Sequence, residues 1–367
     1  MRPCRQSHFS YLEFACRSDH RKVLTVVVSG MFRRNRTPGA SILLVELELR
    51  ITDMTSIGID LGGTNIKAAV VDQNKGILEK LSVTTEAEKG KEHVFDRINS
   101  VVERLMEKTD ADPKGIGMGV PGMVDLARKV VRNCPNLGWE IAYAADEVEK
   151  RTGLSCIIDN DANLAALGSS RFGVGREFDS LIMLTLGTGV GGGIILNRKL
   201  YRGTTGAASE LGHVIINFNG PYSNSNTRGS IEAYLGQRFL SRLAAEVIRQ
   251  HPDNPLYKKF QNDFSKLEPV DLYEEAEDGN ELGIHILHEA GEKLGYAIVN
   301  YIHVLDIRKI IVSGGVAQAG SWLVEPARET VLKYMMPPFH DGFDILYEPL
   351  GNDAALYGAS SLALEHL

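Results

Sequence analysis

Residues 57–71 read IGIDLGGTNIKAAVV, and 125 positions further on residues 182–196 read IMLTLGTGVGGGIIL. Each stretch is an apolar run, a turn of small residues and a second apolar run. The runs are too short for helices and rich in β-branched residues, so each stretch predicts a β-hairpin. Small side chains leave backbone N–H groups exposed in these turns, which suits phosphate. Two phosphate-binding hairpins predict a nucleotide held between two related domains, and therefore an ATP-dependent transferase.

Other glycine-rich phosphate sites fit the second stretch less well. Residues 187–192 match Gly-x-Gly-x-x-Gly, but a dinucleotide-binding fingerprint needs a helix directly after the glycines. Here residues 194–199 read IILNRK, which predicts a strand and a polar turn. No Gly-x-x-x-x-Gly-Lys-Ser/Thr occurs, which excludes a P-loop. Two purely structural hairpins are the remaining alternative, and Asp60 counts against it by placing a carboxylate where a metal–phosphate partner belongs.

Size and composition indicate a globular protein of more than one domain. The chain has 367 residues, of which 43% are hydrophobic and 24% charged. The formal net charge of -7 counts against nucleic-acid binding, and no apolar run is long enough to span a membrane. The four cysteines show neither metal-site nor disulfide spacing, so a cytoplasmic location is expected. They are Cys4, Cys16, Cys134 and Cys156.

Residues 1–53 differ from the rest of the chain. They hold nine Lys or Arg against five Asp or Glu, and two of the four cysteines. Glu13 and Asp19 count against a transit peptide, and no pair of amphipathic helices can be drawn for a helix-turn-helix. We therefore expect a poorly ordered extension or a translated upstream stretch, with Met54 as the natural start of the folded unit.

From residue 54 onward, strands alternate with helices, which is typical of an α/β fold. Hydrophobic spacing predicts the helices, and short apolar runs predict the strands. Residues 201–226 are rich in Gly, Ser and Asn and predict a long loop. The expected helices are 93–108, 140–152, 164–172, 231–250, 282–305, 322–334 and 354–364, and the further strands are 82–85, 115–120, 156–158 and 310–312.

Two groups of polar residues are candidates for chemistry. Asp161 lies at a strand-to-helix junction, where a carboxylate can stabilise the helix start or act as a general base toward an attacking hydroxyl. Glu210, His213 and Glu232 supply acceptors and a switchable donor around the predicted loop. That set suits a polyhydroxylated ligand such as a sugar, although a solvated loop with a helix-capping Glu232 is the alternative.

Six motifs in order resemble the ROK (repressor, open reading frame, kinase) family of sugar kinases, within the actin/hexokinase superfamily. The resemblance runs from about residue 56 to the C-terminus, and residues 135–139 (PNLGW) resemble the glucokinase members in particular. The motifs are 60–67 (DLGGTNIK), 119–125 (GVPGMVD), 160–163 (NDAN), 186–193 (LGTGVGGG), 210–213 (ELGH) and 313–316 (SGGV).

The resemblance implies a role for each matching residue. Asp161 matches the catalytic base, and Asp60 matches the carboxylate near Mg²⁺, acting through water. The sugar ligands are Gly122, Asn160, Glu210, His213 and Glu232. The phosphate loops are Gly62, Gly63, Thr64, Lys67, Thr188 and Gly189, and the adenosine-side turn is Gly314 and Gly315.

The chain departs from the family pattern at the zinc site. Zinc-containing members carry a His and then Cys-x-Cys-Gly-x-x-Gly-Cys-x-Glu, whereas residues 223–232 here read SNSNTRGSIE. Ser223, Ser225 and Ser230 replace the three cysteines, and a neutral hydroxyl is a poor zinc ligand. His213 alone cannot hold the metal, so no zinc is expected. Hydrogen bonds from Ser and Asn must then organise the loop, or the loop is softer.

The resemblance implies a two-domain actin-like/hexokinase-like (ribonuclease H-like) ATPase fold. The smaller α/β domain would comprise residues 55–172 and 355–367, and the larger one 173–354. The implied reaction is ATP- and Mg²⁺-dependent phosphorylation of a hexose, glucose first, at its primary hydroxyl, in carbohydrate metabolism. A homodimer or higher homo-oligomer is expected, with no nucleic-acid or membrane partner.

Three alternatives stay open at this point. An N-acetylhexosamine such as N-acetylmannosamine would find the same polar ligands, and polyphosphate could replace ATP as donor. A sugar-sensing repressor on the same fold would need a DNA-binding N-terminus. The character of residues 1–53 and the intact Asp161 favour the kinase over the repressor.

Overall fold

The computed structural model describes residues 23–28, 43–48 and 54–367. The chain forms two compact units, Met1–Met54 and Thr55–Leu367. In the first unit, β1 (Val23–Val28) pairs antiparallel with β2 (Leu43–Glu48), a hairpin that the sequence analysis did not predict. The rest of the expected poorly ordered extension lies outside the described residues.

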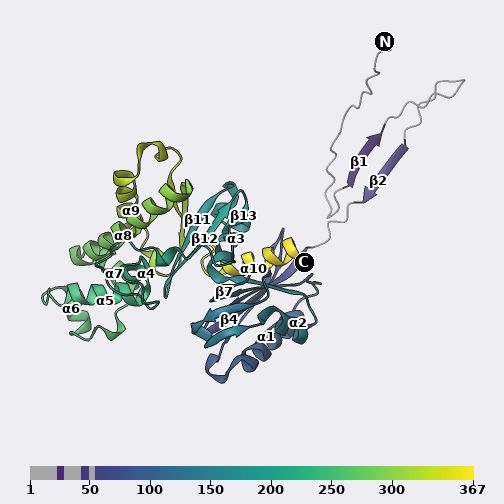
Figure 1. Ribbon diagram of the computed structural model, residues 1–367, viewed down its shortest axis with the longest axis horizontal. Helices are drawn as coiled ribbons and strands as arrows, with labels where there is room; N and C mark the ends of the chain where they lie inside the picture. The colour runs from purple at the N-terminus through teal and green to yellow at the C-terminus, as the bar shows by residue number, and fades with distance from the viewer. Residues whose placement is uncertain (1–22, 29–42, 49–53) are drawn as a thin grey trace, which may run out of the picture. The chain divides into compact units, whose positions relative to one another are not determined.

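The second unit is built around two five-stranded sheets (Figure 1). In the first sheet the strand order is β10-β6-β3-β4-β5; β3, β6 and β10 run parallel, and β4 is antiparallel to both of its neighbours. The hairpin predicted over residues 57–71 is β3–β4 and is confirmed. The strands are β3 (Thr55–Leu61), β4 (Asn65–Asp72), β5 (Gly76–Thr84), β6 (Ile116–Val120) and β10 (Cys156–Asn160).

The second sheet repeats this topology. Its order is β13-β12-β11-β14-β15, with β11, β14 and β15 parallel and β12 antiparallel to both neighbours. The second predicted hairpin is β11–β12, so both glycine turns occupy the same corner of equivalent sheets. The strands are β11 (Leu181–Leu186), β12 (Val190–Leu196), β13 (Lys199–Leu200), β14 (Lys309–Ser313) and β15 (Asp344–Tyr347).

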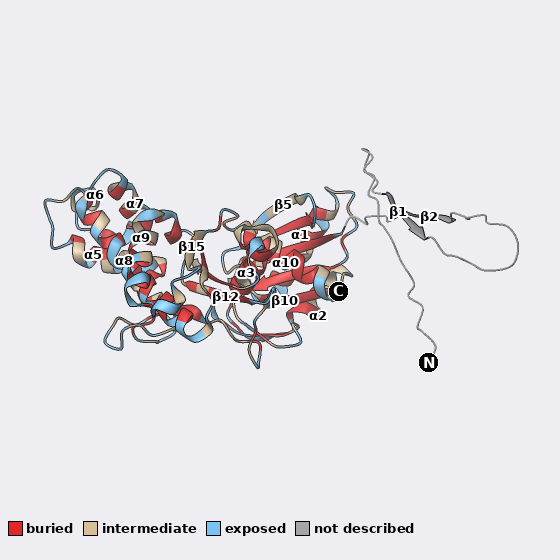
Figure 2. Cartoon of the chain, turned by 90° about the horizontal axis from the view of Figure 1, so that it is seen from above, coloured by how far each residue is buried: buried red, intermediate tan, exposed pale blue. Residues whose placement is uncertain are grey.

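Two buried helices, α3 (Asp161–Phe172) and α10 (Asp353–His366), connect the sheets (Figure 2). A Cβ on Gly117 of β6 would lie 1.8 Å from the carbonyl oxygen of Ala359 in α10, so only glycine allows this approach. Similarly, a Cβ on Gly168 of α3 would lie 1.9 Å from the carbonyl oxygen of Ala354. Side chains of α3 and α10 also share a core cluster with β11, β12 and β14.

The remaining helices form the outer layers. α1 (Lys91–Met106) and α2 (Ala144–Thr152) bury their apolar faces against the first sheet, as the i, i+3/i+4 spacing of α1 predicts. The other helices pack with the second sheet in one large core. They are α4 (Glu232–Leu235), α5 (Gln237–Ile248), α6 (Pro255–Phe260), α7 (Pro269–Glu277), α8 (Glu281–Leu305) and α9 (Ser321–Tyr334).

Three sequence expectations need correction. Residues 140–142 belong to β9 (Trp139–Ala142), which pairs with β8 (Val131–Cys134) and, through it, with β7 (Met123–Val124) in a small sheet. The helix expected over 231–250 breaks at Gly236, whose extended ψ of 136° separates α4 from α5. The helix expected from residue 164 begins at Asp161 because Asn160 caps it. No helix in the described ranges combines the length and apolarity needed to cross a membrane.

Candidate active site

The carboxyl ends of the parallel strands of the first sheet gather the candidate catalytic residues. Asp60 at the end of β3 and Asp159 near the end of β10 are both in register with Gly119 of the intervening β6. A Cβ on Gly119 would lie 3.4 Å from the Cα of Asp161. Gly119 of β6, which has no side chain, therefore lies between Asp60 and Asp161. The charge of Asp60 consequently raises the pKa of Asp161.

Asp161 is the first residue of α3. The side chain of its neighbour Asn160 accepts a hydrogen bond from the Ala162 N–H at 3.0 Å, and Asp161 Oδ1 accepts one from the same N–H at 2.8 Å. Burial raises the pKa of Asp161 to about 7, helped by the charges of Asp60 and Glu210, although the Ala162 N–H lowers it. Such a carboxylate exchanges a proton near neutral pH, which suits a general base.

Asp60 lies beside Lys67. Burial raises the pKa of the Asp60 carboxyl, and the charge and hydrogen bond of Lys67 lower it. The Lys67 Nζ atom lies 3.4 Å from Asp60 Oδ2, and the two side chains are 30% and 18% exposed. The Asp60 side chain is thus mostly buried but still partly exposed, next to the first glycine turn.

The first glycine turn, residues 62–64, is held from two sides. Thr85 donates its hydroxyl to the Gly62 carbonyl at 2.6 Å and its N–H to the Thr64 carbonyl at 2.8 Å. On the other side, a Cβ on Gly63 would lie 2.9 Å from the carbonyl oxygen of Asn136. Thr64 itself is exposed. The turn is a fixed loop with one open side.

The second glycine turn, residues 187–189, is closed by a hydrogen bond from the Gly187 N–H to the Gly189 carbonyl at 2.9 Å. Thr188 at its tip is exposed. Glu232, a predicted sugar ligand, lies directly against this turn, and its Oε2 accepts a hydrogen bond from the Val190 N–H at 3.3 Å. A Cβ on Gly189 would lie 2.4 Å from the same oxygen, so the glycine makes room for the carboxylate.

Gly314 and Gly315 lie beside the second turn. They follow directly after β14, which pairs with β11 up to Ser313, opposite Thr185. Gly314 has a φ of 97°, and a Cβ there would lie 2.4 Å from the carbonyl oxygen of Leu186. Gly315 faces open space. The structure thus brings the predicted adenosine-side turn, Gly314 and Gly315, next to the second glycine turn.

The other predicted sugar ligands form two small groups. The Asn160 side chain donates to the Gly122 carbonyl at 3.4 Å. His213 Nε2 lies 3.7 Å from Glu210 Oε2, and Glu210 is close enough to Asp161 to raise its pKa. Asn160 and Glu210 therefore lie near Asp161, the candidate base, while Glu232 is held at the second turn.

Hydroxyl groups organise the loop in which the resemblance places the zinc ligands of other family members. Ser225 Oγ contacts His213 Nδ1 at 3.2 Å, Ser223 Oγ at 2.8 Å and Thr227 Oγ1 at 3.0 Å. Ser230 is buried, and its strand-like bridge to Ile215 closes the loop. Within the described part of the chain, no group of three or more His, Cys, Asp or Glu side chains could hold a metal ion.

A buried ionic network next to Asp161 was missed by the sequence analysis. Asp159 is fully buried; its Oδ2 lies 2.6 Å from Arg128 Nη1 and 2.8 Å from Arg202 Nε. Its Oδ1 accepts hydrogen bonds from the Asn160 N–H at 2.8 Å and the Asn163 amide at 3.0 Å. The only sequence signal was a carboxylate inside an apolar strand, which usually requires a buried partner. The network fixes the segment that carries Asp161, the candidate base.

Comparison with known proteins gives a consistent result. A family model described as ROK family matches residues 56–366. The chain is 36% identical over 313 residues to the glucokinase of Thermotoga maritima, which covers 85% of this chain and 98% of that protein. It is 33% identical, with a TM-score of 0.75, to the structure of a ROK family glucokinase from Streptomyces griseus in complex with glucose and AMPPNP. That match covers 85% of this chain and 99% of the other.

A third relative supports the same fold. The structure of the ROK hexokinase from Thermus thermophilus is 28% identical to this chain, with a TM-score of 0.68, and the match covers 84% of this chain and 97% of the other. The duplicated sheets, the paired glycine turns and these likenesses agree. The chain therefore belongs to the ROK family, as a sugar kinase with the actin-like/hexokinase-like fold.

Proposed function

We propose that the protein transfers a phosphoryl group from ATP to the primary hydroxyl of a hexose, with glucose as the first candidate. The observation that carries this proposal is Asp161, a carboxylate with a pKa of about 7 at the junction of the sugar-side residues and the glycine turns. In its ionised form Asp161 accepts the proton of the attacking hydroxyl, which makes the oxygen a better nucleophile.

The sugar would be held by groups beside Asp161 and by Glu232 at the second turn. Glu210 and Glu232 offer charged acceptors for sugar hydroxyls, His213 offers one donor or acceptor, and Asn160 and the Gly122 segment line the approach to Asp161. Charge-assisted hydrogen bonds of this kind orient one hydroxyl toward the base. The complex of the Streptomyces griseus relative with glucose supports this choice of substrate.

The residues present fit ATP and Mg²⁺. Gly63 and Thr64 in the first turn and Thr188 and Gly189 in the second offer backbone N–H groups and hydroxyls. Gly62 shapes the first turn, since its N–H donates to the Asn65 carbonyl at 2.9 Å. Lys67 offers a positive charge, and Gly314 and Gly315 give room for the adenosine side. Asp60 would hold Mg²⁺ through water, and the ion supplies charge neutralisation for the transferred phosphoryl group. The AMPPNP in the Streptomyces griseus complex supports ATP as the donor.

A coupled kinase assay tests the proposal. Purified protein is supplied with glucose, mannose, N-acetylglucosamine or N-acetylmannosamine, and with either ATP or polyphosphate, each with Mg²⁺. We expect the highest kcat/KM with glucose and ATP, and NMR of the product should show phosphate on the primary hydroxyl. A higher kcat/KM with an N-acetylhexosamine than with glucose would make that sugar the substrate. Lack of turnover with every combination of sugar and phosphoryl donor would reject the proposed kinase activity.

A further inference from the structure

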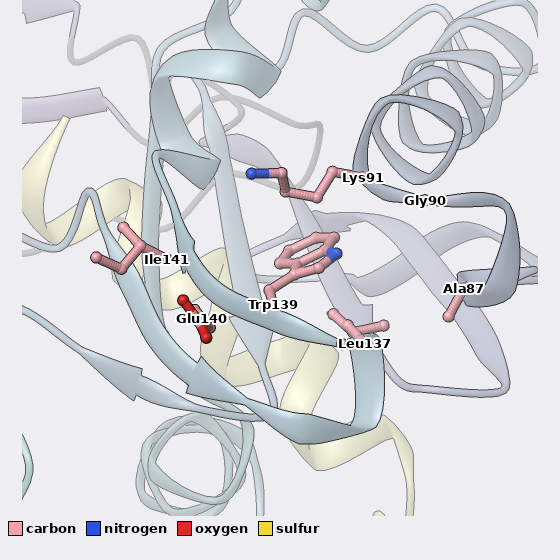
Figure 3. A pocket seen from close by; sticks show the side chains of 8 residues that line it. Ala87, Gly90, Lys91, Leu137, Trp139, Glu140 and Ile141 are labelled. Atoms are coloured by element: carbon pink, nitrogen blue, oxygen red, sulfur yellow. The ribbon is translucent and has the colours of Figure 1, made fainter.

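A cavity lies between the N-terminus of α1 and residues 137–141 (Figure 3). Its volume is about 540 Å³. The lining includes Ala87 and Gly90 on one side and Leu137, Trp139 and Glu140 on the other. None of the residues assigned above to sugar, phosphate or base lines this cavity.

Trp139 presents an unused hydrogen-bond donor here. Its side chain is only 4% exposed and packs on Phe95 with ring centroids 5.2 Å apart. The indole Nε1 is buried and has no hydrogen-bond partner among the residues that the structure describes. Figure 3 shows this nitrogen directed toward the space between Ala87 and Gly90. Because a buried N–H without an acceptor destabilises the fold, a missing acceptor is expected in this space.

The start of α1 adds positive potential to the same cavity. Gly90 caps the helix with a φ of 92° and no side-chain hydrogen bond, so the first N–H groups of this 16-residue helix lack a side-chain acceptor. Lys91 lines the cavity, is exposed, and forms no ion pair with any described residue. In Figure 3 its ammonium group lies above Trp139, on the side away from Ala87, and Glu140 contributes a carboxylate to the lining.

We propose that this cavity binds the oxyanion group, phosphate or carboxylate, of a small metabolite. The lysine, the helix N-terminus and the indole N–H all supply donors, and an oxyanion supplies the acceptors they lack. Gly90 and Gly138 leave room for it, since a Cβ on either would have no atom within 4 Å.

The position of the cavity predicts an effect on the nucleotide. Residues 137–141 continue directly from Asn136, whose carbonyl oxygen packs against Gly63 of the first glycine turn. A ligand that orders this segment changes the support of that turn. The oxyanion is therefore expected to alter the KM for the phosphoryl donor, whichever sugar the enzyme uses.

Trp139 is itself a reporter for the test. The chain has two tryptophans, so Trp322→Phe leaves Trp139 as the sole indole in the full-length protein. Inorganic phosphate and malonate are titrated separately at constant ionic strength, and the fluorescence of Trp139 is followed. We expect saturable binding of at least one probe, and the two arms show whether a phosphate or a carboxylate is preferred.

Two matched variants locate the binding. Lys91→Gln should weaken the affinity about tenfold, as expected for loss of a charged donor, whereas Lys150→Gln removes an equivalent exposed charge from α2 and should leave it unchanged. Ala87→Leu should weaken it by filling the cavity without a change of charge. Thermal unfolding by circular dichroism checks that each variant is folded.

Two results would overturn the proposal. One is the absence of saturable binding of both probes. The other is equal affinity in the Lys91→Gln and Lys150→Gln proteins, which would assign the signal to the glycine turns. Because binding is measured without sugar or ATP, neither result depends on the proposed kinase reaction.

Discussion

At the scale of single residues, the pKa of Asp161 sets the expected pH dependence of activity and stability. Because the base must be ionised, kcat/KM should rise between about pH 6 and about pH 8, along a limb centred near the pKa of about 7. The effect of pH on folding stability has the opposite sign to its effect on activity. The folded state keeps a proton that the unfolded carboxyl releases above pH 3.8, so folding stability falls as pH rises from about 4 to about 7.

Asp161→Asn tests both consequences. The amide keeps the shape and can still accept from the Ala162 N–H, but it cannot take a proton. We expect kcat to fall by about 10²- to 10⁴-fold. Calorimetry should show a gain in stability on the order of 1 kcal/mol at pH 8, with little change at pH 4. Near-normal turnover would reject Asp161 as the base, and a loss of stability confined to high pH would reject the raised pKa.

Glu210 is expected to act on the sugar and on Asp161 together. Glu210→Gln replaces a charged acceptor, worth about 1.5–3 kcal/mol in a closed site, by a neutral one, so the KM for sugar should rise about tenfold or more. Its negative charge also raises the pKa of Asp161, so the acidic limb of the pH profile should move to lower pH. Glu246→Gln, at an exposed position in α5, is the control. A selective rise in the KM for ATP would contradict the sugar-side placement.

At the scale of elements, the loop around residues 213–230 depends on hydroxyl groups in place of a metal. Ser225 contacts His213, Ser223 and Thr227 at the same time. Ser225→Ala should therefore free the His213 ring and raise the KM for sugar a few-fold, with the KM for ATP unchanged. Steady-state kinetics with each substrate varied in turn measure this. An unchanged sugar KM would mean that His213 is held by other contacts.

The same loop predicts the metal content. Tetrahedral zinc needs four strong ligands, and three of the four family positions are serine here. Elemental analysis of tag-free protein should find no stoichiometric zinc, and a zinc chelator should leave activity unchanged while Mg²⁺ stays essential. One zinc per chain, lost on chelation together with activity, would reveal a site built from other residues.

Arg202, in the segment after β13, contacts Asp159 in β10. Its side chain lies 2.8 Å from Asp159 and donates to the carbonyls of Asp125 at 2.9 Å and Val124 at 3.2 Å. Arg202→Lys keeps the charge but cannot span these acceptors, and should cost about 1–3 kcal/mol in urea unfolding. Arg198→Lys, in an exposed pair, should change stability by less than about 0.5 kcal/mol. Equal effects of the two changes would show that the buried network is not structural.

At the scale of the whole molecule, removal of residues 1–53 should leave folding and kinase activity intact. The core clusters of the described residues lie within Thr55–Leu367, and that unit holds every assigned site residue. Thermal unfolding and kcat/KM of a protein starting at Met54 should match the full chain. An insoluble or inactive truncation would show that the extension supports the fold.

Local sequence patterns were sufficient for most of the elements. The two hairpins and the helices α1, α8 and α9 were predicted within a few residues, because short β-branched runs and i, i+3/i+4 apolar spacing report the burial of one segment at a time. The break at Gly236 was missed because apolar residues recur at helical spacing across it, as Leu235 and Phe239 do. Only the structure shows that the Gln237 N–H donates to the Gly187 carbonyl of the second turn, at 2.9 Å.

The candidate residues came from the sequence motifs and their resemblance to the ROK family, whereas Asp159 and its arginine partners did not. What only the tertiary structure decided is which of them meet. Asp60 and Asp161 lie 101 positions apart and act on each other because β3 and β10 flank one glycine-bearing strand. Contacts between distant segments also place Glu232 at the second turn and bring Arg128 and Arg202 to Asp159. Charge, burial and pKa depend on distances in space, and a linear sequence does not contain those distances.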